Sequence, residues 1–525
     1  MGARRTNKRP ANLELTDGDQ SPRILKAANV ILAGGGLFCL LCLFLLLRRH
    51  GWTDEGSFDG GVVLLLLAPA LAAVLLFASL RLPPSARTGL ALVLFSTTIA
   101  LYSVELVLQL LDAPGDRERR TLWTPATSQD MDELVRIARE HGVAYDRRSK
   151  LEVLMDLRSA DPGAVPAIVP KGLLARQGDG TLKSQISIDG VEVVALGGIS
   201  NRTTVLCNES GEWIAYSSDE HGFHNPAGIW SRSNIEVAVI GDSFAQGVCV
   251  PSPQNAVALI RDRYPATVNL GMLGHGPLME LAQLKEYVAR LKPRTVLWFF
   301  YEENDFADLM HERDSPLLMS YLQGPYRQGL ASVQPTIDES LEDYVAGEIE
   351  QTQLRGDHLP DVPTQESNIV TGITAVILLG NLRRRLGLTL QSRNAAENHR
   401  IASDEAMALL KKIFAEATET VSSWSGRLYF VYIPERQRYT DPATTELNET
   451  NREAILRLAG DLGIPVIDIH SAIESQEDPL SLYPFRRRGH FNEEGYRLVA
   501  ESVLKAIEHP GSVPQPDGGR SPASH

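Results

Sequence analysis

The sequence predicts an α/β domain with a parallel five-stranded sheet and helices on both faces, preceded by three transmembrane helices and a small region of short strands. Two observations lead to this prediction. Five short, nearly continuous apolar runs alternate with helical patterns after residue 230, and three long apolar runs stand before residue 112. With 525 residues, the chain is also too long for a single compact core.

The five short runs are expected to form the strands of the sheet. They lie at residues 235–240, 267–270, 295–301, 428–433 and 466–469. Helical patterns at 255–263, 278–291, 404–424, 453–462 and 493–508 separate or follow them. Asn492 is a favourable N-cap for the last of these helices. A parallel sheet of this kind places its active site at the carboxyl ends of its strands.

The three long runs, at residues 27–47, 61–80 and 89–111, are each long enough to cross a bilayer, which takes about 20 residues of helix. They are apolar on every face, unlike the helices of a soluble core. Lysine and arginine concentrate in the tail before the first run and in the loop after the second. This bias predicts a multi-pass protein of the cell (inner) membrane with its C-terminal domain in the periplasm. The first run lacks a convincing cleavage site, so we expect a retained anchor.

These patterns divide the chain into five parts. We expect a cytoplasmic tail at 1–26, transmembrane helices within 27–111, a linker and accessory region with short strands at 112–230, the α/β domain at 231–508, and a disordered tail at 509–525. Residues 315–399 interrupt the α/β pattern as an insertion. This insertion could be a lid or touch the membrane surface, but a plain packed helix is the simpler interpretation.

Composition excludes some functions and directs attention to two cysteines. The net charge is -14 and no long basic patch follows the apolar runs, which argues against nucleic acid as a partner. No metal-ligand spacing or phosphate-binding loop indicates a metal or cofactor.

Cys207 and Cys249 are the cysteines of the part predicted to be exported. We expect them to form a disulfide, the alternative being two separate buried thiols.

Four polar residues follow predicted strand ends or precede the last helix. Ser243 ends a Gly-Asp-Ser turn after the first strand, Gly274 lies in a turn after the second, Asn304 follows the third, and His490 precedes the final helix. A serine hydroxyl needs a base to become a nucleophile, and His490 could serve. A backbone N–H at Gly274 and the Asn304 amide could stabilise an oxyanion. Each residue alone has an equally good structural explanation, so the joint placement carries the prediction.

Together these residues resemble the motifs of the SGNH (GDSL-like) hydrolase superfamily, over about residues 236–508 with the insertion excepted. The resemblance implies a three-layer α/β/α, flavodoxin-like fold. It also implies that Ser243 is the nucleophile, that His490 is the general base, and that the Ser243 N–H, Gly274 and Asn304 form the oxyanion hole. The membrane-anchored layout is similar, more loosely, to exported bacterial members that act on acyl groups of envelope polysaccharides.

Two positions depart from the family pattern. The family has glycine before its Asn-Asp pair, where this chain has Glu303, and aspartate three residues before the histidine, where this chain has Arg487. Without that aspartate the histidine lacks its usual orienting carboxylate. We expect a Ser–His dyad steered by a backbone carbonyl, a carboxylate supplied by Asp468 or Asp478, or a weakened or inactive site.

Two functions follow from these observations. The first is a membrane-anchored serine esterase or O-acyltransferase that acts on ester-linked acyl groups of an extracytoplasmic substrate, such as an acylated carbohydrate. The alternative is a catalytically degenerate domain that serves as a binding or scaffold component of an envelope assembly. The missing aspartate favours the alternative, and the four motif residues favour the enzyme.

Overall fold

A computed structural model describes residues 21–50, 60–111, 128–355, 379, 404–440, 442–487 and 489–510. By its internal contacts the chain divides into two units. One comprises residues 1–117 with 361–392, and the other residues 118–360 with 393–525. The predicted disordered tail, apart from its first two residues, and most of the predicted insertion after residue 355 lie outside the described residues.

The first unit holds three helices where the long apolar runs predict them: α1 (Pro22–His50), α2 (Gly60–Ser79) and α3 (Pro84–Leu111). Helix α1 contacts both of the others. Among the described residues, two stretches are long and apolar enough to cross a membrane, Pro22–Phe44 and Pro84–Glu105.

The expectation of three spans is therefore met, by length and composition, in two helices only. In α2 the apolar stretch that can be assessed, Pro69–Ser79, is shorter. The large apolar side chains of these helices are widely exposed, with Val30 71% and Leu92 68% accessible. Such exposure differs from that of a core helix in a soluble protein.

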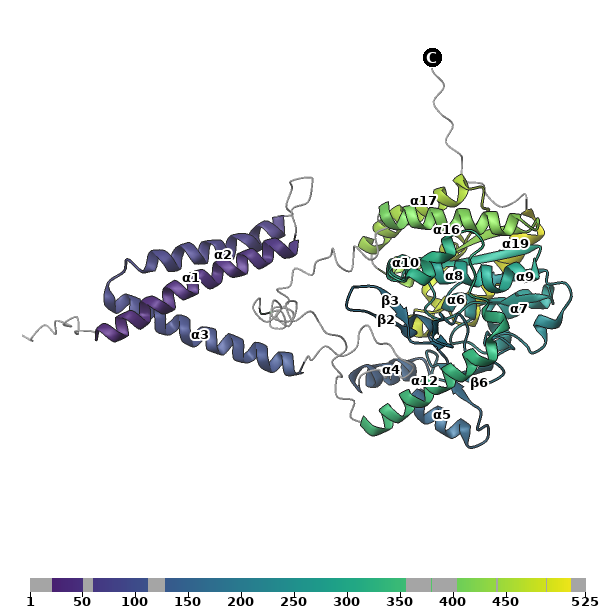
Figure 1. Cartoon of the computed structure of the whole chain (residues 1–525), viewed down its shortest axis with the longest axis horizontal. Coiled ribbons are helices and arrows are strands. Elements are labelled where there is room, and N and C mark those ends of the chain that lie inside the picture. The colour runs from purple at the N-terminus through teal and green to yellow at the C-terminus, as the bar shows by residue number, and fades with distance from the viewer. Residues whose placement is uncertain are drawn as a thin grey trace, which may run out of the picture. The chain divides into compact units, whose positions relative to one another are not determined.

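The second unit contains the predicted parallel sheet (Figure 1). Its strands are β8 (Val237–Ile240), β9 (Thr267–Asn269), β10 (Thr295–Tyr301), β11 (Arg427–Ile433) and β12 (Val466–Asp468). Their spatial order is β12-β11-β10-β8-β9, and every neighbouring pair is parallel. In chain order this is 2-1-3-4-5, a doubly wound arrangement whose topological switch point lies between β8 and β10. A ligand site is therefore expected where β8 and β10 end.

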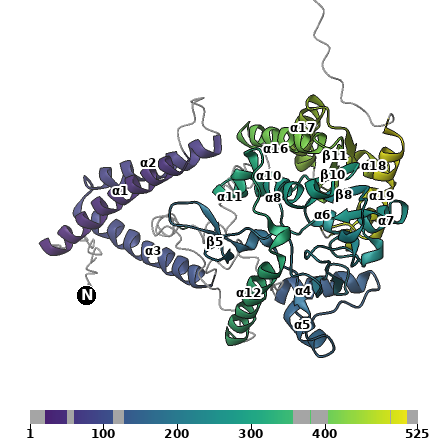
Figure 2. The same ribbon diagram turned by 45° about the vertical axis from the view of Figure 1, so that its right-hand side comes forward.

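Alternating side chains of these strands enter two separate apolar cores. Trp298 and Phe300 join one core, and Leu297 and Phe299 the other. The first core is covered by α8 (Pro277–Gln283), α10 (Asp305–Glu312), α16 (Asp404–Ser422) and α17 (Pro442–Asp461), and the second by α7 (Ala256–Arg263), α18 (Ile469–Glu474) and α19 (Glu493–Glu508). Figure 2 shows these two groups of helices on opposite sides of the sheet.

The accessory region packs onto the first of these cores. It comprises α4 (Ser128–Glu140), α5 (Lys150–Arg158), a three-stranded sheet of β1 (Val165–Pro166), β6 (Thr203–Cys207) and β7 (Ile214–Ser217), and the two-stranded pairs β2 (Leu174–Arg176) with β3 (Leu182–Ser184) and β4 (Ser187–Ile188) with β5 (Val191–Glu192). Its buried residues Leu154, Val165 and Leu196 belong to the same cluster as Trp298. The accessory region and the α/β part thus share a core.

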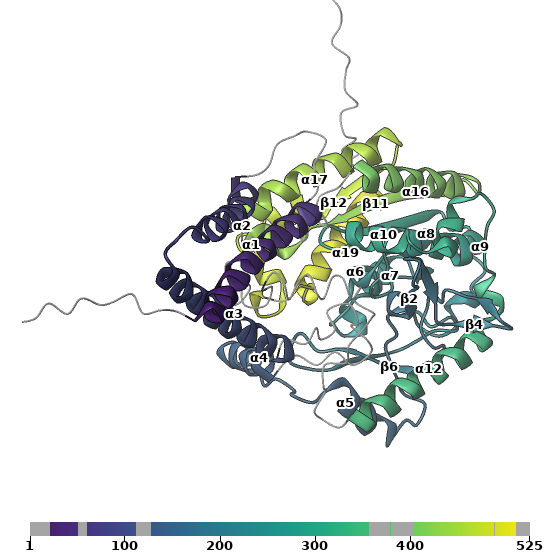
Figure 3. The same cartoon turned by 60° about the vertical axis from the view of Figure 1, so that its left-hand side comes forward.

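The described part of the insertion is helical and packed. Helix α12 (Gln334–Arg355) buries Ile337 and Leu341 in the first core and lies near β6 in Figure 3. Its Asp338 accepts hydrogen bonds from the Ser200 backbone N–H at 2.9 Å and from its hydroxyl at 2.6 Å. Residues 356–378 and 380–403 lie outside the described part of the chain.

Candidate active site

The candidate nucleophile stands on a tight turn at the end of β8. Gly241 has φ +148°, and a Cβ atom there would lie 2.9 Å from both Ala245 Cβ and Phe299 Cβ, so the turn requires glycine. Asp242 caps the short helix α6 (Ser243–Gln246) by accepting from Phe244 N at 2.9 Å. Ser243 is therefore the first residue after the cap, with its side chain at the carboxyl edge of the sheet.

His490 lies within hydrogen-bonding distance of Ser243, as expected. The distance from His490 Nε2 to Ser243 Oγ is 2.9 Å. Phe491 is fully buried, and Asn492 caps α19 by accepting from the backbone N–H groups of Glu494 and Gly495 at 3.1 Å each. The burial of Phe491 and the helix cap at Asn492 therefore hold the backbone of His490 in place.

The other nitrogen of this imidazole contacts a carboxylate that sequence reasoning missed. His490 Nδ1 lies 2.9 Å from Glu209 Oε1, and the two side chains are 20% and 18% exposed. Glu209 is in the connection between β6 and β7, in the accessory region. Ser243, His490 and Glu209 are thus linked in the order of a nucleophile, base and acid triad. The sequence offered one indirect indication of Glu209, because this residue lies two positions after Cys207, a cysteine predicted to form a disulfide.

A disulfide ties the Glu209 connection to the nucleophile turn. Cys207 and Cys249 are bonded, with Cα atoms 5.5 Å apart, which confirms the predicted pair. Cys249 is six residues after Ser243, and Cys207 is two residues before Glu209. The disulfide therefore links the segment that carries Ser243 covalently to the segment that carries Glu209.

Hydrogen bonds from a third segment hold the same connection in place. Asn208 O accepts from Tyr145 Oη at 2.9 Å, and Asn208 Nδ2 donates to Asp146 O at 3.0 Å. Gly211 O accepts from Asp146 N at 2.8 Å. The acid of the site is therefore supported on both sides, by the disulfide and by the segment after α4.

The electrostatics of His490 differ from those of other buried histidines. Burial alone would lower its pKa, but the Glu209 carboxylate, helped by Asp242 and Glu303, outweighs burial and raises the pKa above the ordinary value. By contrast, burial lowers the pKa of His224 to about 4 and that of His275 to about 3. Of these three histidines, His490 is the one suited to hold a proton during a reaction near neutral pH.

The turn after β9 runs alongside the nucleophile turn. Met272 N donates to Gly241 O at 3.1 Å, and Leu273 N donates to Gln246 Oε1 at 2.9 Å. The next residue, Gly274, has φ +79°, a left-handed conformation that favours glycine. These bonds bring the Gly274 backbone to the edge of the sheet that carries Ser243.

Asn304 follows β10, the neighbour of β8 across the switch point. It precedes α10, but its side chain does not cap that helix. Instead, Asn304 Nδ2 donates to Asp308 Oδ2 at 3.1 Å, which leaves a second N–H of the amide for another acceptor. Tyr301, at the end of the same strand, packs against Phe244 with ring centroids 4.2 Å apart and the rings tilted by 39°.

The carboxylates considered from the sequence as orienters of His490 lie elsewhere. Asp478 forms an ion pair with Arg486, and Arg487, at the usual aspartate position, lies 3.6 Å from Glu133. Asp468 forms an ion pair with Arg452 and caps α18. The expectations of a carboxylate from Asp468 or Asp478, or of a dyad steered by a backbone carbonyl, are therefore wrong. A hairpin distant in sequence supplies the carboxylate instead.

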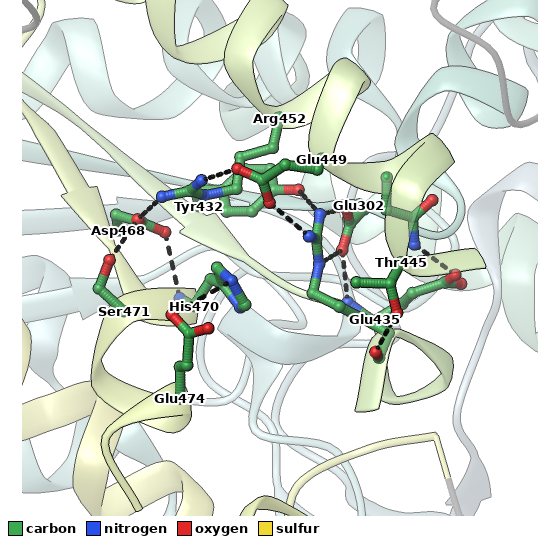
Figure 4. A network of polar contacts seen from close by, with 12 residues as sticks. Glu302, Tyr432, Glu435, Thr445, Glu449, Arg452, Asp468, His470, Ser471 and Glu474 are labelled. Carbon is green, nitrogen blue, oxygen red and sulfur yellow. Dashed lines mark hydrogen bonds and ion pairs between the residues drawn. The ribbon is translucent and has the colours of Figure 1, made fainter. Parts of the chain in front are cut away.

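Asp468 belongs to a network of ion pairs at the ends of β10, β11 and β12 (Figure 4). Buried Arg438 pairs with Glu302 and Glu449, and Arg452 pairs with Glu449 and Asp468. A cavity of about 480 Å³ adjoins it, lined by Arg438, Tyr439, Thr445, Glu449, Thr450, Glu453, His470, Glu474 and Pro479. The network fastens the segments after β11 and β12 to the sheet.

Three side chains around His490 have atoms spaced closely enough to surround a metal ion. Ligand atoms of Glu209, Cys249 and His490 lie within 4.8 Å of one another. The Cys249 sulfur is bonded to Cys207, and the carboxylate and imidazole are hydrogen-bonded to each other. This donor set does not suit a metal, because a disulfide sulfur is not a thiolate ligand.

No family model and no curated protein matches the chain, but solved structures are similar to it. A putative lipolytic protein of the G-D-S-L family from Desulfitobacterium hafniense DCB-2 is 13% identical, with coverage of 52% of this chain and 99% of that chain and a TM-score of 0.28. The acetylxylan esterase Axe2 from Geobacillus stearothermophilus is 13% identical, with coverage of 52% of this chain and 93% of that chain and a TM-score of 0.28. A lipase/acylhydrolase from Enterococcus faecalis is 14% identical, with coverage of 54% of this chain and 99% of that chain and a TM-score of 0.27. These neighbours are lipolytic proteins and esterases of the kind that the motifs resemble, but likenesses of this size say nothing about activity.

Proposed function

We propose that this protein is a membrane-anchored serine esterase or O-acyltransferase of the SGNH type, with Ser243, His490 and Glu209 as its triad. The observation that carries the proposal is the pair of 2.9 Å contacts that His490 makes, one through each ring nitrogen, to Ser243 Oγ and Glu209 Oε1. A hydroxyl, an imidazole and a carboxylate in this order activate a serine for attack on an acyl carbon.

The chemistry follows from these contacts. Ser243 Oγ attacks the acyl carbonyl while His490 Nε2 takes its proton, and the Glu209 carboxylate stabilises the imidazolium. The carbonyl oxygen becomes an oxyanion, for which the Gly274 N–H, the Ser243 N–H and the free N–H of Asn304 are the proposed donors. His490 then gives its proton to the leaving alcohol. Water or a second hydroxyl group repeats these steps in reverse and takes the acyl group from Ser243.

We infer the place of action from the helices of the first unit. Two helices long enough to span a bilayer, with exposed apolar side chains, favour a membrane anchor, and the distribution of lysine and arginine favours a periplasmic α/β domain. The Cys207–Cys249 disulfide agrees with an oxidising compartment. We therefore propose a substrate that is made or held outside the membrane, such as an acylated envelope carbohydrate.

The scaffold alternative loses its main support. It depended on a missing carboxylate, and Glu209 occupies that role at hydrogen-bonding distance. A scaffold would have no need of a base whose pKa is raised beside a serine hydroxyl.

Labelling with a fluorophosphonate probe, which reacts with activated serines, tests the proposal. The wild-type chain should be labelled at one site, and Ser243→Ala should not be labelled at all. Ser252→Ala, a serine bonded to His224 and outside the proposed triad, serves as the matched control and should label normally. A wild-type protein that is folded but unlabelled would support the scaffold reading.

A further inference from the structure

A short chain of polar contacts joins the accessory region to the end of β10. Lys171 Nζ forms an ion pair with Asp308 Oδ1, and Asp308 Oδ2 accepts the 3.1 Å hydrogen bond from Asn304 Nδ2. The Asp308 side chain is only 5% exposed, while that of Lys171 is 32% exposed. A carboxylate this deeply buried requires a partner for its charge. Lys171 supplies that partner from outside the α/β fold.

Lys171 also lies against the turn that carries Gly274, whose backbone N–H is another proposed oxyanion donor. A Cβ atom on Gly274 would lie 3.7 Å from Lys171 Cβ and 2.8 Å from Val169 Cγ1. A Cβ atom on Gly276 would lie 2.6 Å from Asp308 Cβ. The segment Val169–Lys171, the turn 274–276 and Asp308 are therefore in mutual contact.

The charge of Asp308 matters because its hydrogen-bonding partner, Asn304, is a proposed donor to the oxyanion. Asp308 lies among other buried acids whose pKa values are raised by burial and, in addition, by the charge of Asp308, namely Asp242, Glu280, Asp305 and Glu312. Burial raises the pKa of Asp308, and the ion pair with Lys171 opposes this shift. Without Lys171, the buried Asp308 carboxylate would tend to take up a proton, and this would change the hydrogen bond that it accepts from Asn304.

We propose that Lys171 is a positioning residue for the oxyanion side of the site. By neutralising Asp308 it keeps the Asn304 amide oriented as a donor to the oxyanion. This inference depends on the proposed esterase function and concerns a part of the site that the triad does not include. The accessory region would thus serve both sides of the reaction, the base through Glu209 and the oxyanion through Lys171.

The test uses the full-length protein with p-nitrophenyl acetate as substrate. Lys171→Met should lower kcat by about 10- to 100-fold with little change in KM, since misplacing a donor costs less than removing it. Lys171→Arg keeps the charge and should retain most of the activity. Lys183→Met removes an exposed lysine of the same region and should behave as wild type. In an Asn304→Ala background, Lys171→Met should add little further loss, because its target is gone.

Two results would overturn the inference. One is a Lys171→Met variant with unchanged kcat, and the other is an equal loss of kcat in the wild-type and Asn304→Ala backgrounds. If Lys171→Met does not fold, Asp308→Asn provides a second test. The Lys171→Met/Asp308→Asn double variant should fold, because no buried charge is left without a partner, and it should be as active as Asp308→Asn alone. A double variant that is less active than Asp308→Asn would contradict charge neutralisation. Failure of the proposed function would be distinct, since wild type itself would then resist the fluorophosphonate probe.

Discussion

His490 Nδ1 lies 2.9 Å from Glu209 Oε1, although 281 positions separate the two residues in the chain. The proposed nucleophile and base belong to the α/β fold, whereas the proposed acid comes from a hairpin of the accessory region. This arrangement makes the accessory region a part of the site, and it explains why the position three residues before His490 can be an exposed arginine.

Replacement of Glu209 by glutamine should show its role through the pH profile as well as the rate. The amide cannot stabilise the imidazolium, so kcat should fall by about 10²- to 10⁴-fold. Because the carboxylate raises the pKa of His490, its loss should lower that pKa and move the acid limb of the kcat/KM profile to lower pH. Glu212→Gln, on an exposed residue of the same hairpin connection, should change neither. An unchanged acid limb in Glu209→Gln would remove Glu209 from the mechanism.

Reduction of the Cys207–Cys249 disulfide should lower activity by releasing the Glu209 connection. A misplacement of about 1 Å can cost as much as 10²-fold in rate. We expect a loss of about 10- to 100-fold in wild type after reduction, and a similar loss in the Cys207→Ser/Cys249→Ser variant. Glu209→Gln should lose little more on reduction, because the group that the disulfide positions is already absent. Equal losses in both proteins would show that the disulfide acts on the fold in general.

Gly274→Ala should be destabilised and slow. Its φ of +79° strains any other residue, and the added Cβ would lie 2.8 Å from Val169 Cγ1. We expect a loss of about 1–3 kcal/mol in the free energy of unfolding, together with reduced kcat. Gly347→Ala is the contrasting variant, since this glycine lies within α12 and a Cβ there meets nothing within 4 Å. It should gain about 0.5–1 kcal/mol in thermal or denaturant unfolding. The same response in both variants would contradict this account.

Glu280→Gln should flatten the dependence of stability on pH. Glu280 is fully buried and accepts from Trp298 Nε1, and burial with neighbouring acids raises its pKa well above the ordinary value. A raised carboxyl pKa stabilises the fold at low pH, and this stability is lost as pH rises from about 4.3 toward the folded-state pKa, at up to about 1.4 kcal/mol per pH unit. Urea unfolding from pH 5 to 8 should show a decline in wild type that is smaller in Glu280→Gln. Exposed Glu339→Gln should decline as wild type does, and a parallel decline in Glu280→Gln would refute the assignment.

The predicted topology places residue 508 outside the membrane. A reporter that is active only in the periplasm, fused after Glu508, should therefore be active, because the lysine and arginine bias holds the N-terminus inside. A cytoplasmic reporter at the same position should be silent. The opposite pattern would overturn the proposed location of the site.

The sequence by itself determined the parallel sheet, the turns that carry Ser243, Gly274 and Asn304, and the helix behind His490. These features follow from local patterns, because a short apolar run bounded by glycine or by a capping residue specifies a strand end or a helix start wherever it occurs. The Cys207–Cys249 pair was also predictable, since the part predicted to be exported offered no other cysteine as a partner. Only the tertiary structure decided which carboxylate serves His490 and which cation serves Asp308. Glu209 lies in the connection between β6 and β7 and Lys171 in a short 3-10 helix (Pro170–Leu173), neither of them within a motif. Their proposed roles arise from the packing of the accessory region against the carboxyl edge of the sheet. Contacts between residues so distant in the chain depend on the whole fold, so no local pattern in the sequence encodes them.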